Sequence, residues 1–211
     1  RCVLEGGCGE IVEKKSRFLA TVRPVETEEE ASAFIEEMKK KYWDATHNCF
    51  AYVAGERREW VRAADDGEPS GTAGRPMLDV LLGEDLYNTA VVVTRYFGGT
   101  LLGTGGLVRA YSRAVQEALK ACTVIEKCRG SLLEIETDYG DLGKIQYILG
   151  QRKIPLLQSA YTDRVILEVI LPVQGEGELK KALTESTGGR AYIREKGNPW
   201  YAEIGGQVKI F

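Results

Sequence analysis

The chain has 211 residues, of which 44% are hydrophobic and 28% are charged, and its formal net charge at pH 7 is −3. This length suffices for one large domain or two small ones, and the composition is that of an ordinary globular protein. The net charge excludes a surface that is basic throughout, so any surface for nucleic acid would be a local patch.

The cysteines and the apolar runs bear on compartment and cofactors. The five cysteines are odd in number and form no C-x-x-C pair, a spacing that predicts neither a zinc site nor a disulfide framework. We therefore expect a cytoplasmic protein in a reducing compartment, without a cofactor. No apolar run reaches the roughly 18 residues of a membrane helix and no signal segment opens the chain, so no membrane partner is expected.

The first half of the chain mixes strands and helices. Residues 10–25 alternate as in a strand, with Phe18, Ala20 and Val22 on one face. Thr27 is expected to cap the next helix, because TEEE places a carboxylate at the third helical position and three acids in the first turn. Two further strands are predicted, at 48–55 and 59–64.

A central strand and two helices follow. After the loop ADDGEPSGTAGRP, the pattern predicts a short helix from about 73 to 82. TAVVVTRYF (89–97) is a continuous β-branched run, typical of a buried central strand. An amphipathic helix is predicted over about 105–121, with Arg109 and Arg113 opposite its apolar stripe. The apolar stripe comprises Leu107, Tyr111, Ala114, Val115 and Ala118.

From residue 129 the element order becomes β-α-β-β-α-β, the pattern of a ferredoxin-like split βαβ unit. The predicted elements are strand 131–139, helix 141–149, strands 154–162 and 164–172, helix 175–187 and a final strand region, 190–204. We therefore predict an α+β protein of two domains, residues 1–128 and 129–211.

A glycine-rich loop joins the central strand to the amphipathic helix. Backbone N–H groups at a helix start bind anions, and glycines let the backbone approach them closely. No acidic residue lies between Asp85 and Glu117, and arginine forks match phosphate geometry. The sequence thus predicts a phosphate site formed by Arg95, Gly98, Gly99, Thr100, Gly103, Thr104, Gly105, Gly106, Arg109 and Arg113. A second loop, with Ser70, Gly71, Thr72 and Arg75, is expected to add to it.

The alternative is structural. Glycines also permit tight packing of a strand against a helix, with the arginines simply solvated. The loop is neither a Walker A motif, which needs a lysine, nor G-x-G-x-x-G.

Four other features of the sequence could carry chemistry. Asp65, Asp66 and Glu68 could hold Mg²⁺ beside substrate phosphates, although an acidic surface turn explains them more simply. His47 is the only histidine and has no nucleophile motif nearby, so local hydrogen bonding is favoured over catalysis. Cys49 is expected to be a small core residue. Of Tyr96 and Phe97, at most one could stack on a nucleic-acid base.

Four segments together resemble the YigZ/IMPACT family, over about residues 14–120: SRFLATV, ATHNCFAYV, DDGEPSGTAGRPML and RYFGGTLLGTGGLVRAYSRA. Residues 129–211 resemble the smaller C-terminal domain of the bacterial members. The resemblance implies a first domain with the ribosomal protein S5 domain 2-like fold and a ferredoxin-like second domain similar to one in elongation factor G. It also implies a link to translation, which the eukaryotic members regulate, and nucleic-acid or ribosome binding is the usual suggestion for bacterial members. Nothing here resembles the RWD domain of the eukaryotic proteins, so partner interactions made through that domain are not carried over.

Two functions remain open at this stage. The first is a regulator of translation whose partner is RNA or the ribosome, with possible protein partners in translation control. The second is a Mg²⁺-dependent enzyme acting on a phosphorylated small molecule, since the S5-like fold is shared with small-molecule kinases. Fold likeness alone does not decide between them. The lack of a P-loop lysine, a histidine base and a paired nucleophile favours the first.

Overall fold

The computed structural model describes residues 1–211 as two compact units, unit 1 (residues 1–125) and unit 2 (residues 126–211). Both contain helices and strands, so the predicted two-domain α+β class is confirmed. The boundary lies slightly before the predicted residue 128. Lys127 illustrates why, because its ammonium lies 4.3 Å from the ring centroid of Phe211 and so belongs with unit 2.

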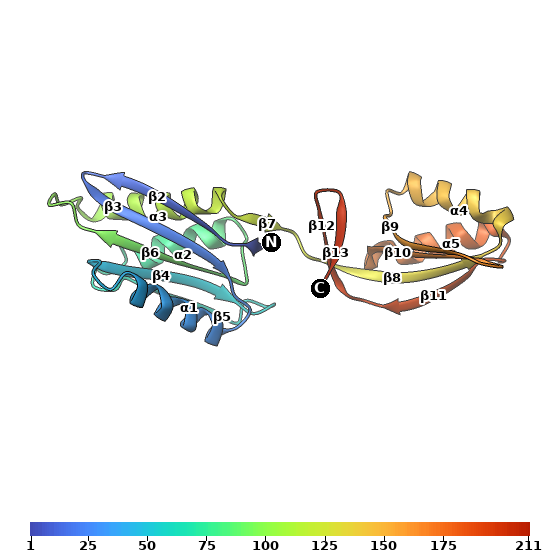
Figure 1. Cartoon of the computed structure of the whole chain (residues 1–211), viewed down its shortest axis with the longest axis horizontal. Helices are drawn as coiled ribbons and strands as arrows, with labels where there is room; N and C mark the ends of the chain where they lie inside the picture. The colour runs from blue at the N-terminus through green and yellow to red at the C-terminus, as the bar shows by residue number, and fades with distance from the viewer. The chain divides into compact units, whose positions relative to one another are not determined.

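Unit 1 is built on one antiparallel sheet with the strand order β2-β3-β6-β4-β5 (Figure 1). Its strands are β1 (Cys2–Glu5), β2 (Gly7–Glu13), β3 (Ser16–Pro24), β4 (His47–Ala54), β5 (Trp60–Ala64), β6 (Thr89–Tyr96) and β7 (Thr123–Ile125). Its helices are α1 (Glu28–Lys41), α2 (Gly74–Gly83) and α3 (Thr104–Lys120). β1 and β7, which the sequence pattern did not predict, pair as a separate antiparallel ribbon.

The central position of β6 is confirmed, and its side chains alternate between two hydrophobic cores. Val91 and Val93 belong to the core that α2 and α3 cover, whereas Ala90 and Val92 belong to the core under α1. The predicted apolar stripe of α3 is buried throughout. β2 and α3 approach closely, since a Cβ on Gly9 would lie 2.5 Å from the backbone nitrogen of Ala118.

The prediction of a single strand over 10–25 is wrong. Residues 7–24 form a hairpin in which β2 turns into β3 through Lys14 and Lys15 alone. Both lysines have positive φ, 45° and 68°, a conformation that two-residue hairpin turns normally assign to Asn and Gly. Because the turn lacks those residues, the alternating pattern shows no break there.

Local signals predicted α1 correctly. The Thr27 side chain caps the helix by accepting from the backbone N–H of Glu30, and three lysines occupy its last turn.

No helix in the structure has both the length and the apolar character that a membrane crossing requires.

Unit 2 contains the predicted β-α-β-β-α-β order. Its elements are β8 (Cys128–Thr137), α4 (Tyr139–Gln151), β9 (Leu156–Tyr161), β10 (Val165–Pro172), the 3₁₀ turn η1 (Val173–Gly175), α5 (Glu176–Thr187), β11 (Tyr192–Gly197), β12 (Trp200–Ile204) and β13 (Gln207–Ile210). The strands pair in the order β11-β8-β10-β9. The last strand of the β-α-β-β-α-β pattern, β11, therefore lies beside the first, β8, as in a ferredoxin-like sheet. The predicted final strand region is split in two, and β12 pairs with β13 and with the start of β8.

Candidate phosphate-binding site

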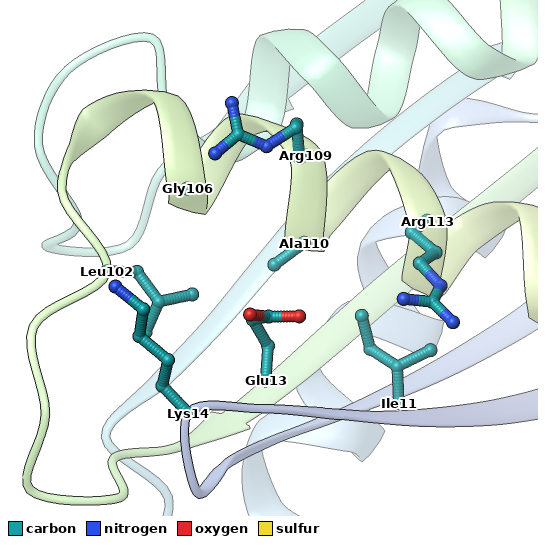
Figure 2. A pocket seen from close by; sticks show the side chains of 8 residues that line it. All are labelled: Ile11, Glu13, Lys14, Leu102, Gly106, Arg109, Ala110 and Arg113. Atoms are coloured by element: carbon teal, nitrogen blue, oxygen red, sulfur yellow. The ribbon is translucent and has the colours of Figure 1, made fainter.

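A hollow of about 220 Å³ lies in unit 1 between the β2–β3 hairpin and the first half of α3 (Figure 2). Its lining residues are Ile11, Glu13, Lys14, Leu102, Gly106, Arg109, Ala110 and Arg113. Two of the predicted arginines therefore share one site, and a lysine of the hairpin turn adds a third cation.

Helical geometry explains why the two arginines line the same hollow. Residues four apart lie on the same helix face, so Arg109 and Arg113 project side by side from α3. Helical side chains lean toward the N-terminus, and Nη1 of Arg109 comes within 3.6 Å of the point where a Cβ of Gly105 would lie. Neither guanidinium makes a hydrogen bond or an ion pair within the protein. Arg113 interacts electrostatically with Glu117 further along the helix, but no hydrogen bond fixes either guanidinium, so both can bind an anion.

The N-terminus of α3 has no side-chain cap. Its N-cap residue is Gly103, and the first N–H groups of a helix have no acceptor inside the helix. No acidic residue occupies the first turn either. The partial positive charge of this helix end is thus left to a ligand or to solvent.

The glycines of the loop serve different purposes. Gly98 is required by packing, since a Cβ there would lie 2.1 Å from the carbonyl carbon of Lys15, and Gly106 fits against Leu102. Gly99 and Gly103 adopt positive φ with open space around them. Gly105 is different, because it is helical and has no neighbour closer than the Arg109 guanidinium. The packing alternative therefore accounts for part of the loop and leaves Gly105 unexplained.

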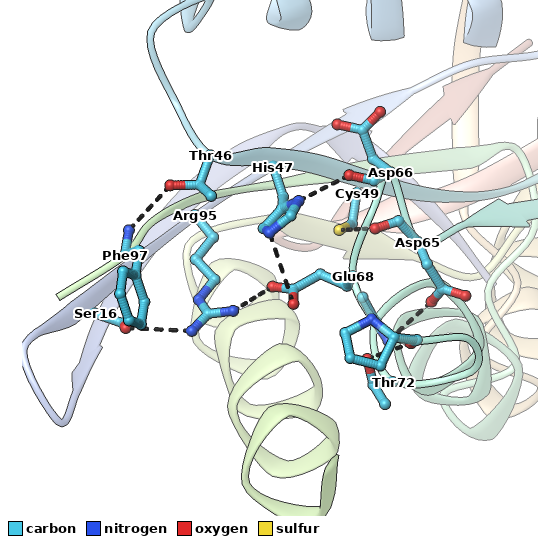
Figure 3. Close-up of polar contacts among 12 residues, drawn as sticks. Ser16, Thr46, His47, Cys49, Asp65, Asp66, Glu68, Thr72, Arg95 and Phe97 are labelled. Carbon is cyan, nitrogen blue, oxygen red and sulfur yellow. Dashed lines mark hydrogen bonds and ion pairs between the residues drawn. The ribbon is translucent and has the colours of Figure 1, made fainter. Parts of the chain in front are cut away.

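Arg95 does not join this surface, which corrects the sequence interpretation. The alternation along β6 places it on the face of Val91 and Val93, which α2 and α3 cover. There its side chain is only 6% exposed, and Nη1 lies 2.6 Å from Oε1 of Glu68 (Figure 3). Its guanidinium carbon also lies 5.3 Å from the ring centroid of Phe18 and 5.6 Å from that of Phe97. A buried arginine that already holds a carboxylate cannot contact a phosphate on the surface.

The second predicted loop is also occupied by the protein itself. The Asp65 carboxylate accepts hydrogen bonds from the backbone N–H groups of Gly71, Ala73 and Gly74 at 2.8–3.0 Å, at the start of α2. Partial burial opposes ionisation of Asp65, but these three donors outweigh it and hold the pKa of its carboxyl below the usual range. An internal carboxylate therefore fills the place that the sequence assigned to a phosphate.

The side chains of that loop are engaged or lie elsewhere. The Thr72 hydroxyl donates to the carbonyl of Pro69 at 2.6 Å, and Arg75 pairs with Asp79 at 2.8 Å. The hollow beside α3 is lined by none of the residues predicted from this loop, Ser70, Gly71, Thr72 and Arg75. It is also not lined by six of the residues predicted from the glycine-rich loop: Gly98, Gly99, Thr100, Gly103, Thr104 and Gly105. Thr100 and Gly103 nevertheless lie in the loop that leads into α3, and Thr104 and Gly105 are the first residues of that helix.

The carboxyl groups of the acidic turn contact groups within the protein. Asp66 accepts from the backbone N–H of Asn48 at 2.7 Å, and its carbonyl lies 2.8 Å from Nδ1 of His47. Glu68 is buried between Arg95 and the hydroxyl of Tyr111. The three carboxyl groups thus point to different partners, and no cluster of three or more His, Cys, Asp and Glu side chains is placed to hold a metal ion.

Local hydrogen bonding explains His47 and Cys49. The imidazole bridges the Asp66 carbonyl and, at 3.8 Å, the Glu68 carboxylate. Cys49 is fully buried, and its thiol lies 2.9 Å from the carbonyl of Asp65 and 3.3 Å from the Tyr111 hydroxyl. Burial raises the pKa of the Cys49 thiol and, likewise, that of Tyr111, so neither group ionises near neutral pH. Of the two aromatic residues considered for stacking, Phe97 is the more exposed, and the Tyr96 hydroxyl donates to Asp44.

Sequence reasoning missed Glu13 and Lys14. Both lie within the stretch interpreted as one strand, so the turn that carries them to α3 was not visible. The only signal was the charged pair Lys14-Lys15 in the middle of an alternating apolar pattern.

The fold and the site define a two-domain α+β protein with a cationic hollow beside an uncapped helix. The model of the Impact N-terminal domain matches residues 14–119, and that of a domain of unknown function, DUF1949, matches residues 135–190. The chain belongs to the IMPACT family. It is similar to YvyE of Bacillus subtilis, with 45% identity over 92% of this chain and 89% of that protein, and to YigZ of Escherichia coli, with 39% identity over 83% and 87%. A crystal structure described as that of a hypothetical protein aligns with a TM-score of 0.58 and 35% identity, covering 91% of this chain and 94% of that one.

Proposed function

We propose that this protein is a cytoplasmic regulator of translation that binds RNA, free or within the ribosome, by holding backbone phosphates on the face formed by Arg109, Arg113 and the start of α3. Membership of a family whose eukaryotic members regulate translation supports the biological context. The observation that carries the proposal is the pair of exposed arginines, neither held by a hydrogen bond or a close ion pair, beside an uncapped helix N-terminus.

The size of the hollow favours a polymer over a small metabolite. At about 220 Å³ it is smaller than the roughly 300–1,000 Å³ of ordinary small-molecule sites. A hollow of this volume can hold one residue of a polymer whose neighbouring residues lie on the surface outside it. The magnesium-dependent enzyme has no supporting observation, because Asp65 and Glu68 are committed to internal partners.

The experiment is a titration of the full chain with labelled single-stranded RNA and with ribosomal subunits, between about 50 and 200 mM salt. Each phosphate contact to a single strand contributes about −0.7 to the slope of log K against log salt. The variant Arg109→Ala/Arg113→Ala should therefore bind more weakly, and its slope should be shallower by about 1.4. Because phosphate contacts carry no sequence information, the loss should be the same for different RNA sequences.

Lys120→Ala is the matched control, since it removes a cation from the far end of the same helix, where Lys120 pairs with Glu117. Its affinity and salt slope should remain close to those of the parent. Equal binding by the double variant and the parent, or no binding of RNA or ribosomal subunits by the parent, would overturn the proposal.

A further inference from the structure

The hollow beside α3 contains a carboxylate as well as three cations. Glu13, the last residue of β2, points into its middle, with Lys14 on one side and Arg113 on the other (Figure 2). Glu13 is partly buried and makes no hydrogen bond or ion pair within 4.0 Å, so it is not simply the partner of a neighbouring cation.

A site for phosphate alone would not favour this arrangement. An ionised carboxylate repels phosphate and only accepts hydrogen bonds, so it needs a donor. Cations with a carboxylate between them therefore suit a ligand that carries a phosphate and, a short distance away, a hydroxyl group. A ribose-phosphate unit has this chemistry, and acidic side chains accept from the ribose 2′-hydroxyl in dinucleotide sites.

The hairpin turn that carries Glu13 and Lys14 is fixed against the loop that leads into α3. Ser16 Oγ, just after the turn, accepts from the backbone N–H of Gly98 at 3.1 Å, and Gly98 packs directly on the backbone of Lys15. Lys14 and Lys15 both take positive φ, which is unfavourable for lysine. The turn thus keeps its charged side chains where Asn and Gly would fit the backbone better.

We propose that the hollow takes one ribose of RNA with its flanking phosphates, one held by Lys14 and the other by Arg109 and Arg113, on either side of Glu13, to which the 2′-hydroxyl donates. The inference rests on the proposed RNA binding and adds that Glu13 selects RNA over DNA, which lacks this hydroxyl.

The test compares binding of the full chain to single strands of one sequence made as RNA, as DNA and as 2′-O-methyl RNA, which cannot donate from that position. The parent should bind the unmodified RNA about tenfold or more tightly than the other two, as expected for a hydrogen bond to a charged acceptor. This arm needs no variant, so it stays informative whatever a substitution does to folding.

Glu13→Ala should bind RNA and DNA with similar affinity, and Glu13→Gln should retain part of the preference, because the amide keeps an acceptor oxygen. Glu10→Ala is the matched control: Glu10 lies on the same strand, an odd number of residues away and hence on the opposite face, where it pairs with Arg17. It should keep the full preference for RNA.

Equal affinity of the parent for the three strands, or an unchanged preference in Glu13→Ala, would overturn the role of Glu13. If binding of the strands by the parent were still weakened by salt and by Arg109→Ala/Arg113→Ala, the proposed function would hold without the role of Glu13. A parent that binds none of the strands and no ribosomal subunits overturns both proposals.

Discussion

The Glu68 carboxylate and the Arg95 guanidinium, 27 residues apart in the sequence, form a buried ion pair with a separation of 2.6 Å. Tyr111 of α3 donates to the same carboxylate oxygen at 2.7 Å. One carboxylate therefore ties the acidic turn to the central strand and to the helix that carries Arg109 and Arg113. The turn that sequence reasoning considered for a metal instead positions the helix of the candidate site.

Replacement of Glu68 by alanine should destabilise unit 1 by about 3–5 kcal/mol, because it leaves Arg95 charged and buried without its partner. The free energy of unfolding can be measured by urea titration, with hydrogen exchange identifying the transition of unit 1. Glu37→Ala is the control, since Glu37 pairs with Arg23 at 2.6 Å on the surface. That exposed pair should contribute only about 0–1 kcal/mol. Similar losses for the two variants would contradict the structural role assigned to Glu68.

Asp65→Asn should destabilise unit 1 by about 0.5–2 kcal/mol, as expected for a residue that caps a helix. Since folding lowers the pKa of Asp65, its ionised form stabilises the protein above the ordinary aspartate pKa of about 4. This contribution is lost as the pH falls through the lower pKa of the folded state. The difference in unfolding free energy between parent and variant should therefore shrink as the pH is lowered below about 4. Asp79→Asn, an exposed position on α2, should show little difference at any pH.

Short-range patterns predicted most of the elements. The TEEE segment predicted the cap and first turn of α1, and the β-branched run predicted the buried strand β6. The order of elements after residue 129 predicted the ferredoxin-like pairing of unit 2. In each case the signal lies within a few residues or in the element order, where helix and strand periodicity act directly.

The candidate site depended on contacts that sequence periodicity does not encode. Arg95 was grouped with Arg109 and Arg113 because it is close in sequence, but its partners are Glu68 and Ser16, the latter 79 positions away. The anion at the start of α2 is the Asp65 carboxylate. Asp65 precedes the loop that was predicted to bind phosphate, and its carboxylate accepts from the backbone N–H groups at the end of that loop. The sequence therefore predicted that Arg109 and Arg113 lie on the exposed face of α3, but it did not show which polar groups already have partners within the protein.

Cysteine labelling tests the burial of the polar cluster. Cys49 is fully buried and burial raises the pKa of its thiol, whereas Cys8 is exposed. The thiolate is the reactive form, so iodoacetamide near neutral pH should label Cys8 in the folded protein and Cys49 only after unfolding. Mass spectrometry of the digested protein at successive times distinguishes the two sites. Labelling of Cys49 at the rate of Cys8 would show that the cluster around Glu68 opens freely to solvent.

Gly105 offers the sharpest separation of stability from function. Glycine in a helix is less favourable than alanine by up to about 1 kcal/mol, and a Cβ at Gly105 would meet nothing closer than 3.6 Å. Gly105→Ala should therefore stabilise unit 1 by up to about 1 kcal/mol. If the backbone at the start of α3 contacts phosphate, the same added methyl should weaken RNA binding, because it stands between the helix N-terminus and the ligand.

Gly143→Ala is the matched control in unit 2, because Gly143 lies in α4 and an added Cβ would also meet no neighbour within 4 Å. It should raise the stability of its own unit and leave RNA affinity unchanged. Both quantities come from the same preparations, by thermal unfolding and by anisotropy titration. A Gly105→Ala protein that is more stable and binds RNA as well as the parent would show that the ligand does not approach this turn of the helix. The arginine side chains, rather than the backbone, would then provide the whole phosphate contact.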